Sequence, residues 1–179
     1  MESSATRFPR RMTMELNSLS LAMLVLAFAA TLKSRSADLP VNGWVEEVRL
    51  YPGAIALKAK LDTGALTSSL DARDIRYFRR AGQQWVRFRV VARNRETGEP
   101  FSQEFERPLV RRVKLRGAGG VDHRPVVTME VRIGQQMLVE EFSLRDRKDM
   151  LYPLLLGRRT LARIGPVDTR RTFTQQTRH

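Results

Sequence analysis

Asp62 is the residue whose neighbours most suggest chemistry. In LDTGA (61–65) it follows the apolar stretch 55–61 and precedes a glycine. Gly64 permits a tight loop and close approach by another backbone, and Thr63 can hydrogen-bond backbone across a symmetric interface. Asp62 is therefore either an ordinary turn aspartate or a catalytic carboxylate. The tripeptide alone does not decide, because it is expected by chance in roughly a few per cent of chains of this length.

The residue types limit which other chemistries the chain can perform. It has no cysteine and only two histidines, His123 and His179. A thiol nucleophile is excluded, and a zinc site of His or thiolate ligands has too few donors. The common phosphate-binding and zinc-protease motifs are absent. Carboxylate chemistry is left, and no cofactor or metal is expected.

Carboxylate hydrolysis needs a second acid beside Asp62. Two carboxylates held together share one proton, so one can act as base toward water while the other acts as acid. One chain supplies one DTG, so the second carboxylate comes from another Asp of the chain or from a second copy. A twofold homodimer is the simplest way to bring a residue beside its own copy.

The N-terminal segment predicts export. Arginines precede the apolar run 19–32, which is shorter than the ~20 residues of a membrane span and fits a secretory signal. The alternatives are an uncleaved membrane anchor and a buried helix of the domain. We therefore expect residues 1–37 to be a signal peptide or anchor, and the domain to be periplasmic or exported, with membrane association if the anchor stays.

The residue pattern of the rest of the chain predicts short strands. Period-two alternation predicts strands over 55–61 and 85–93, and a hairpin of 125–133 and 136–144 turns at Gly134-Gln135. A buried apolar run, a glycine and a short helix-forming stretch follow at 152–165. Many strands with little helix predict an all-β barrel or sandwich.

Three segments, in order, resemble the retropepsin-like aspartic proteases. They are LDTGALTSSL around Asp62, KLRGAGGVDHRPVV at 114–127, and YPLLLGRRTLARIG at 152–165. The resemblance implies a retropepsin-like closed barrel, the acid-protease fold, with one short C-terminal helix. The domain would cover 42–168 and leave 169–179 as a polar, loosely ordered tail.

The chain is also similar to a bacterial group labelled ATP-dependent zinc proteases, now regarded as retropepsin-like and associated with RimK-type glutamate-ligase genes. The residues give the zinc label no support. The resemblance implies that Asp62 is catalytic and that Arg158 braces its loop. The remaining implied site residues are Thr63, Gly64 and Ala65 of the active-site loop, Gly117, Gly119 and Gly120 of a flap, and the structural Gly157.

Two departures from the viral pattern stand out. Leu66 occupies the position where viral-type retropepsins place an acid, so Arg158 is expected to lack its usual partner. The stretch 94–108 is additional and is either a substrate wall or a plain loop.

The formal charge of +13 allows an acidic partner. The expected function is a homodimeric aspartic endopeptidase acting on peptides or proteins, with glutamate-rich peptides among the candidates. The alternative is a non-catalytic module on the same barrel that binds acidic peptides or envelope polymers. Nucleic acid is not expected, because export separates the domain from it.

Overall fold

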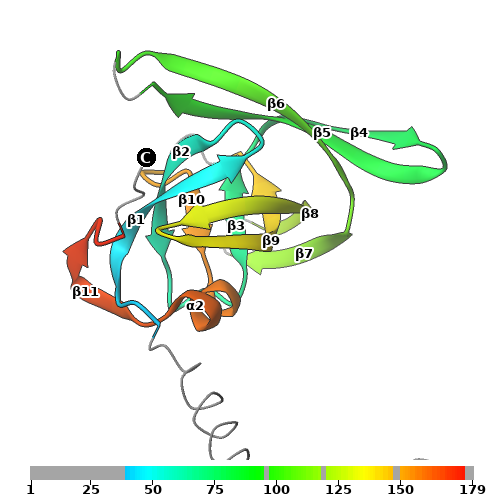
Figure 1. The fold of residues 1–179 in the computed structure, drawn as a ribbon. Coiled ribbons are helices and arrows are strands. Elements are labelled where there is room, and N and C mark those ends of the chain that lie inside the picture. Colours follow the sequence, from blue (N-terminus) through cyan, green and yellow to red (C-terminus); the bar gives the residue numbers. More distant parts are fainter. Residues whose placement is uncertain (1–38, 95–96, 118–119, 147–149, 176–179) are drawn as a thin grey trace, which may run out of the picture. The chain divides into compact units, whose positions relative to one another are not determined.

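The structure is a computed structural model that describes residues 39–94, 97–117, 120–146 and 150–175 (Figure 1). The expected signal or anchor at 1–37 and the segment 176–179 lie outside these residues. The elements in chain order are β1 (Asn42–Tyr51), β2 (Ile55–Leu61), β3 (Ser68–Asp71), β4 (Arg73–Arg80), β5 (Gln83–Arg93), β6 (Pro100–Pro108), β7 (Arg111–Gly117), β8 (Gly120–Ile133), β9 (Gln136–Arg145), β10 (Leu154–Leu156), α2 (Arg158–Ile164) and β11 (Val167–Thr172).

The main sheet closes into a barrel. Its strand order is β11-β1-β2-β10-β3-β9-β8-β7, and an additional pairing of β1 with β8, from Val48↔Ile133 to Tyr51↔Glu130, joins the two sides. The barrel strands are therefore β1, β2, β10, β3, β9 and β8, and the short helix α2 follows β10. This confirms the predicted all-β, retropepsin-like closed barrel with one short C-terminal helix.

The core explains why these segments form strands. On β2 the alternate residues Ile55, Leu57, Ala59 and Leu61 are buried, as the period-two pattern predicts. The hairpin of β8 and β9 pairs Ile133 with Gln136 across the predicted turn. These apolar side chains belong to one core cluster that also takes in residues of β5.

A second sheet carries the additional stretch. Strands β4, β5 and β6 form an antiparallel ribbon, drawn in green in Figure 1, and 94–108 provides the β5–β6 turn and β6. One face of β5 joins the common core through Val86, Phe88 and Val90, and Phe88 stacks on Phe105 of β6 with ring centroids 5.6 Å apart. Most of the additional stretch is therefore the strand β6, which pairs with β5 along its whole length.

The C-terminal segment differs from the expected loose tail. Strand β11 pairs in parallel with β1, from Asn42↔Val167 to Val45↔Thr172. Beyond it, Thr174 donates to Glu46 Oε1 from its backbone N–H (2.9 Å) and its hydroxyl (2.6 Å), and Gln175 N–H donates to Oε2 (3.1 Å). Glu46 is fully buried and also accepts from Gly43 N–H at 2.6 Å. A buried carboxylate must be hydrogen-bonded, so it fixes this segment against β1.

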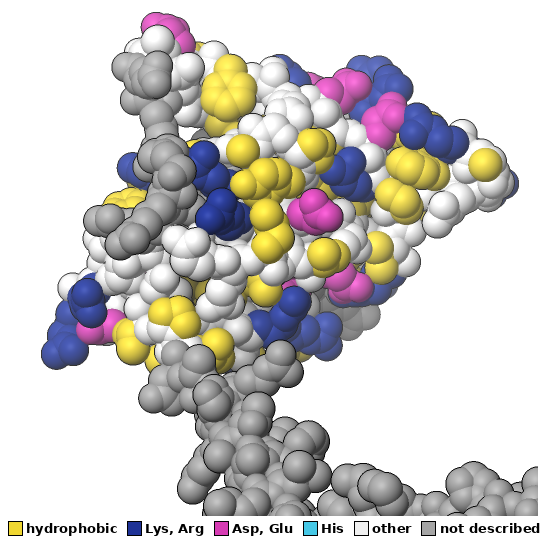
Figure 2. All heavy atoms as spheres, in the orientation of Figure 1, with side chains coloured by type: hydrophobic (Ala, Val, Ile, Leu, Met, Phe, Trp, Pro, Cys, Tyr) yellow, Lys and Arg dark blue, Asp and Glu magenta, His cyan; other side chains and the backbone are white. Residues whose placement is uncertain are grey.

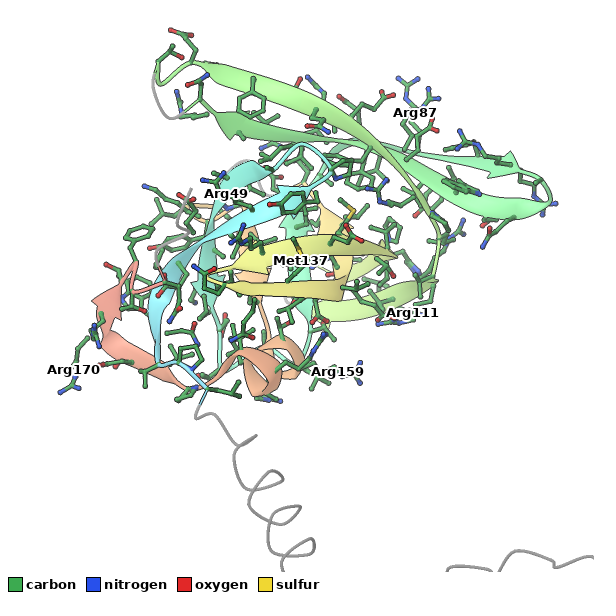
Figure 3. All side chains as sticks on the ribbon, in the orientation of Figure 1. Arg49, Arg87, Arg111, Met137, Arg159 and Arg170 are labelled. Atoms are coloured by element: carbon green, nitrogen blue, oxygen red, sulfur yellow. The ribbon has the colours of Figure 1, made fainter. Side chains whose placement is uncertain are left out.

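Charged side chains are distributed over the surface. On the face shown in Figure 2, Lys and Arg lie in several groups with Asp and Glu among them. Arg87, Arg111, Arg159 and Arg170 project from four different elements (Figure 3). In the described part of the chain, no helix combines the length and apolar character needed to cross a membrane.

Candidate active site

Asp62 lies directly after β2, at the start of the loop that leads to β3. Its backbone N–H donates to Leu156 O of β10 (2.9 Å), and its C=O accepts from Ala65 N–H (3.2 Å), which closes a tight turn. Gly64 N–H donates to Asp62 Oδ1 at 2.9 Å. The Asp62 side chain is 24% exposed. The turn thus fixes one carboxylate oxygen while the carboxyl group remains open to solvent.

Lys60 is the cation beside this carboxylate. Its Nζ lies 3.3 Å from Asp62 Oδ2. Partial burial disfavours the charged form of Asp62 and is the largest single influence on its pKa. The hydrogen bond from Gly64 N–H and the attraction of Lys60 together outweigh burial, with a further contribution from Ala65 N–H, so the pKa of Asp62 lies below its ordinary value.

Arg158, the first residue of α2, braces the loop. Its backbone N–H donates to Ala65 O at 2.8 Å, and its guanidinium Nη1 donates to Thr63 O (3.0 Å) and Gly64 O (3.2 Å). Leu66 was expected to leave this arginine without its usual acidic partner. The loop carbonyls take that place, so bracing here does not need an acid at position 66.

Gly157 lets α2 approach the loop closely. A Cβ at this position would lie 2.6 Å from both Thr67 C and Thr67 O. Real Cβ atoms essentially never come this close to backbone, so a side chain would force the loop and the helix apart. Packing therefore requires a glycine at this position.

The sequence does not predict a buried pair of hydroxyl groups that lies beneath the loop. Ser68 Oγ and Thr160 Oγ1 are 2.7 Å apart, and Gly157 N–H donates to Ser68 Oγ at 3.1 Å. Both residues are almost fully buried. A serine after the motif and a threonine in the helix are unremarkable in the sequence, and only the fold brings them together.

The predicted residues fall into two groups. Asp62, Thr63, Gly64 and Ala65 form one loop, which Gly157 and Arg158 support from below. The predicted flap is the β7–β8 hairpin, in which Gly117 pairs with Gly120 and Gly120 takes a φ of 104°. Gly119 lies outside the described residues. The hydrogen bonds and the ion pair of the Asp62 loop within the described part run to β2, β10 and α2, so the role of the flap stays a prediction.

No metal cluster accompanies the loop. The described residues contain no group of three or more His, Cys, Asp or Glu side chains that could hold an ion. The Asp62 carboxylate contacts a backbone N–H and an ammonium group, neither of which is a metal ligand. These donors do not fit a zinc site.

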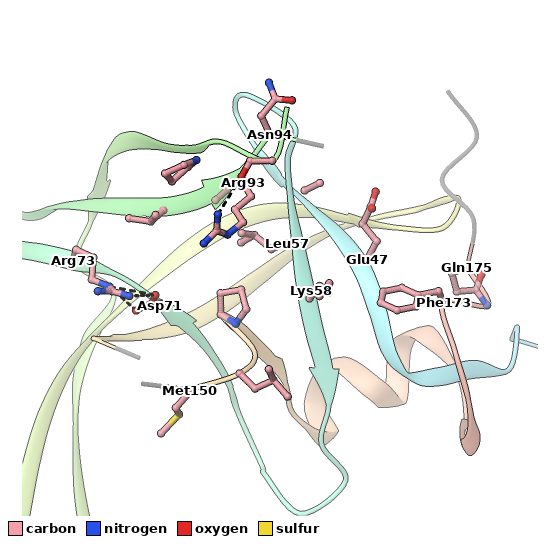
Figure 4. A pocket seen from close by; sticks show the side chains of 17 residues that line it. Glu47, Leu57, Lys58, Asp71, Arg73, Arg93, Asn94, Met150, Phe173 and Gln175 are labelled. Atoms are coloured by element: carbon pink, nitrogen blue, oxygen red, sulfur yellow. Dashed lines mark hydrogen bonds and ion pairs between the residues drawn. The ribbon is translucent and has the colours of Figure 1, made fainter. Parts of the chain in front are cut away.

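A separate cavity of about 1130 Å³ lies away from Asp62. Figure 4 shows Lys58 of β2, Arg93 of β5 and Phe173 around it, with the Asp71–Arg73 ion pair (2.7 Å) at one side. Asp62 does not line this cavity, so the cavity is not part of the Asp62 site.

Fold and loop together define a class of protein, the retropepsin-like barrels that present an Asp-Thr-Gly loop at the end of a barrel strand. Comparison with known families gives the particular group. Residues 41–178 match the RimB-like family, described as the retropepsin-like aspartic endopeptidase RimB. The chain belongs to this family.

Curated relatives carry a similar region within longer chains. A probable alpha-L-glutamate ligase of Shewanella halifaxensis is 30% identical over 131 residues, which cover 72% of this chain and 28% of the relative. A probable alpha-L-glutamate ligase of Desulfotalea psychrophila is 31% identical over 112 residues, 61% of this chain and 23% of the relative. The chain thus spans about a quarter of the length of these relatives.

A solved structure shares the fold. A Legionella pneumophila protein of unknown function (DUF785) is 34% identical, with a TM-score of 0.64, and the match covers 79% of this chain and all of that one. The fold and the family therefore rest on independent comparisons.

Proposed function

We propose that the protein is an aspartic endopeptidase whose catalytic group is Asp62, working as a pair across a homodimer. The observation that carries the proposal is the geometry of Asp62. Gly64 N–H fixes one carboxylate oxygen at 2.9 Å, and Arg158 braces the loop from α2. Membership of a family described as aspartic endopeptidases supports this reading.

The chemistry needs two carboxylates that share one proton. The ionised Asp62 takes a proton from water, and the water oxygen attacks the peptide carbonyl carbon. The protonated Asp62 of the other copy donates its proton to the carbonyl oxygen. The first Asp62 then gives the proton that it took from water to the amide nitrogen, and the second Asp62 takes a proton back from a diol hydroxyl. The C–N bond breaks, and the pair again shares one proton.

Three features support a second copy as the source of the other carboxylate. The chain has one Asp-Thr-Gly sequence. In the described part of the chain, the only ion pair of Asp62 is with Lys60, and no other carboxylate contacts it. Thr63 and Leu66, on the same loop, are exposed, and Leu66 is 51% exposed. An apolar side chain open to water beside the catalytic group suits an interface.

Acidic peptides are the substrate class that we propose. Two observations support this class: the chain carries a net charge of +13, and its curated relatives are named probable alpha-L-glutamate ligases. A protease that is joined to such a ligase in one chain would cleave the bonds that the ligase forms, or would cleave the protein to which the ligase adds glutamate. The expected export of the domain remains part of the proposal.

Digestion of a peptide library by the wild type and by Asp62→Asn, followed by mass spectrometry, tests the function. The wild type is expected to cleave and the variant to leave the library intact, with thermal unfolding as the control for folding. Chelators are expected to have no effect. Equal cleavage by the two proteins would overturn the assignment of Asp62.

The second candidate is a non-catalytic binding module, favoured by Leu66 at the position where viral enzymes have an acid. It predicts that an acidic peptide is captured equally by the wild type and by Asp62→Asn. It also predicts no turnover at any pH from about 3 to 8, a range that includes the upper apparent pKa of a typical aspartic dyad.

A further inference from the structure

Lys60 stands beside the catalytic group in a way that the hydrolytic mechanism does not use. Successive side chains of a strand alternate between its faces, so Lys58 and Lys60 point to the outer face of β2, opposite the buried Ala59 and Leu61. Asp62 follows directly after the strand. Lys60 Nζ is 3.3 Å from Asp62 Oδ2, and the Lys60 side chain is 42% exposed. The ammonium group is therefore at the mouth of the site and within reach of solvent.

The fold does not require this ion pair. Exposed pairs of this kind contribute little to stability, and the Asp62 loop is already held by backbone hydrogen bonds to Leu156 and Arg158. The second cation that contacts the loop, the guanidinium of Arg158, is occupied by the carbonyls of Thr63 and Gly64. Lys60 is thus the cation that can turn toward a ligand.

Charge balance in the proposed dimer leaves this cation in excess. Two copies bring two Lys60 ammonium groups and two Asp62 carboxylates, but the carboxylates share one proton and carry a single negative charge. The four groups together are then net positive at the place where substrate binds. A flexible four-carbon stem lets a lysine follow an anion that is a few ångströms away.

We propose that Lys60 is a specificity-determining residue that binds a side-chain carboxylate of the substrate next to the scissile bond. The preferred substrate is then a peptide with Glu or Asp at that position. The inference rests on the proposed function and adds the group that recognises the acid. A substrate carboxylate would replace Asp62 as the partner of one ammonium group and would cancel the excess charge.

The test uses two peptides that differ only by Glu or Gln beside the bond that the wild type cleaves. For the wild type, kcat/KM is expected to be about 10- to 100-fold higher with the Glu peptide, as for a hydrogen bond between charged groups. In Lys60→Gln this preference should fall to about twofold or less, with the change mainly in KM. Lys60→Arg should keep the preference, because it keeps the charge.

Lys58→Gln is the matched control, since Lys58 lies on the same face of β2, two residues farther from Asp62. It is expected to retain the wild-type preference. An undiminished preference for Glu in Lys60→Gln overturns the role of Lys60, as does an equal loss of activity toward both peptides, which would mean that Lys60 acts through Asp62. If the wild type cleaves no peptide of the library from which the two are chosen, the proposed function itself is overturned.

Discussion

Gly157→Ala tests whether the glycine beneath the Asp62 loop is required by packing. The new Cβ would lie 2.6 Å from Thr67 C and O and 2.8 Å from Thr67 N. These are backbone atoms, so the strain cannot be relieved by rotating a side chain. Reaching a normal carbon contact of about 3.5 Å needs a shift of about 1 Å between α2 and the loop.

The magnitude follows from what that shift disrupts. Overpacking costs about 1–3 kcal/mol. The hydrogen bonds Gly157 N–H to Ser68 Oγ (3.1 Å) and Arg158 N–H to Ala65 O (2.8 Å) would also be strained. Each is worth about 0.5–1.5 kcal/mol. We expect the free energy of unfolding to fall by about 2–6 kcal/mol, a large part of the 5–15 kcal/mol typical of a domain.

The assay is urea unfolding followed by tryptophan fluorescence, with Gly64→Ala as the matched control. A Cβ on Gly64 meets only the side-chain atom Asp62 Oδ1, at 3.2 Å, so stability should change by less than about 1 kcal/mol. The carboxylate would be displaced, and kcat/KM should fall by about 10- to 100-fold. A Gly157→Ala protein as stable as the wild type would refute the packing argument.

Three further predictions concern carboxylates. Glu46→Ala removes the buried carboxylate that accepts hydrogen bonds from Gly43, Thr174 and Gln175. The free energy of unfolding, measured in urea, should fall by about 2–5 kcal/mol, and hydrogen exchange in β11 should accelerate. Normal protection of β11 would contradict the anchoring role of Glu46. Lys60→Gln should raise the pKa of Asp62 in a carbon-13 NMR titration, because Lys60 favours the ionised form; Lys58→Gln should not. Since the pKa of Asp62 is lowered in the folded state, ionised Asp62 stabilises the fold above the unfolded pKa of 3.8, and this contribution is lost as the pH falls through the native pKa. The free energy of unfolding of Asp62→Asn should therefore fall less on acidification than that of the wild type. Equal losses in the two proteins would contradict this.

The barrel could be predicted because its strands carry local signals. β2 and the β8–β9 hairpin have clear period-two burial, and Gly134, with a φ of 54°, marks the turn. The Asp62 loop could be predicted because its residues are contiguous. The position of Lys60 beside Asp62 could also have been predicted, because side chains two residues apart in an extended segment lie on the same face.

The C-terminal strand could not be predicted from its own sequence. β11 has an exposed, mostly polar face and no apolar alternation. Its anchor is Glu46, which contacts Thr174 from 128 positions earlier in the chain. The Ser68–Thr160 pair is hidden for the same reason, because a tertiary contact between polar residues leaves no periodic signal.

Mixing wild type with Asp62→Asn at concentrations above the dimer dissociation constant is the most direct test of a shared dyad. The amount of wild type is held fixed, substrate is in excess, and kcat-limited cleavage is measured as the variant is added. If each active site needs Asp62 from both copies, mixed dimers are inactive, and activity should fall to about one half with an equal amount of variant and to about one tenth with a ninefold excess. Activity that stays constant throughout would contradict the homodimeric dyad.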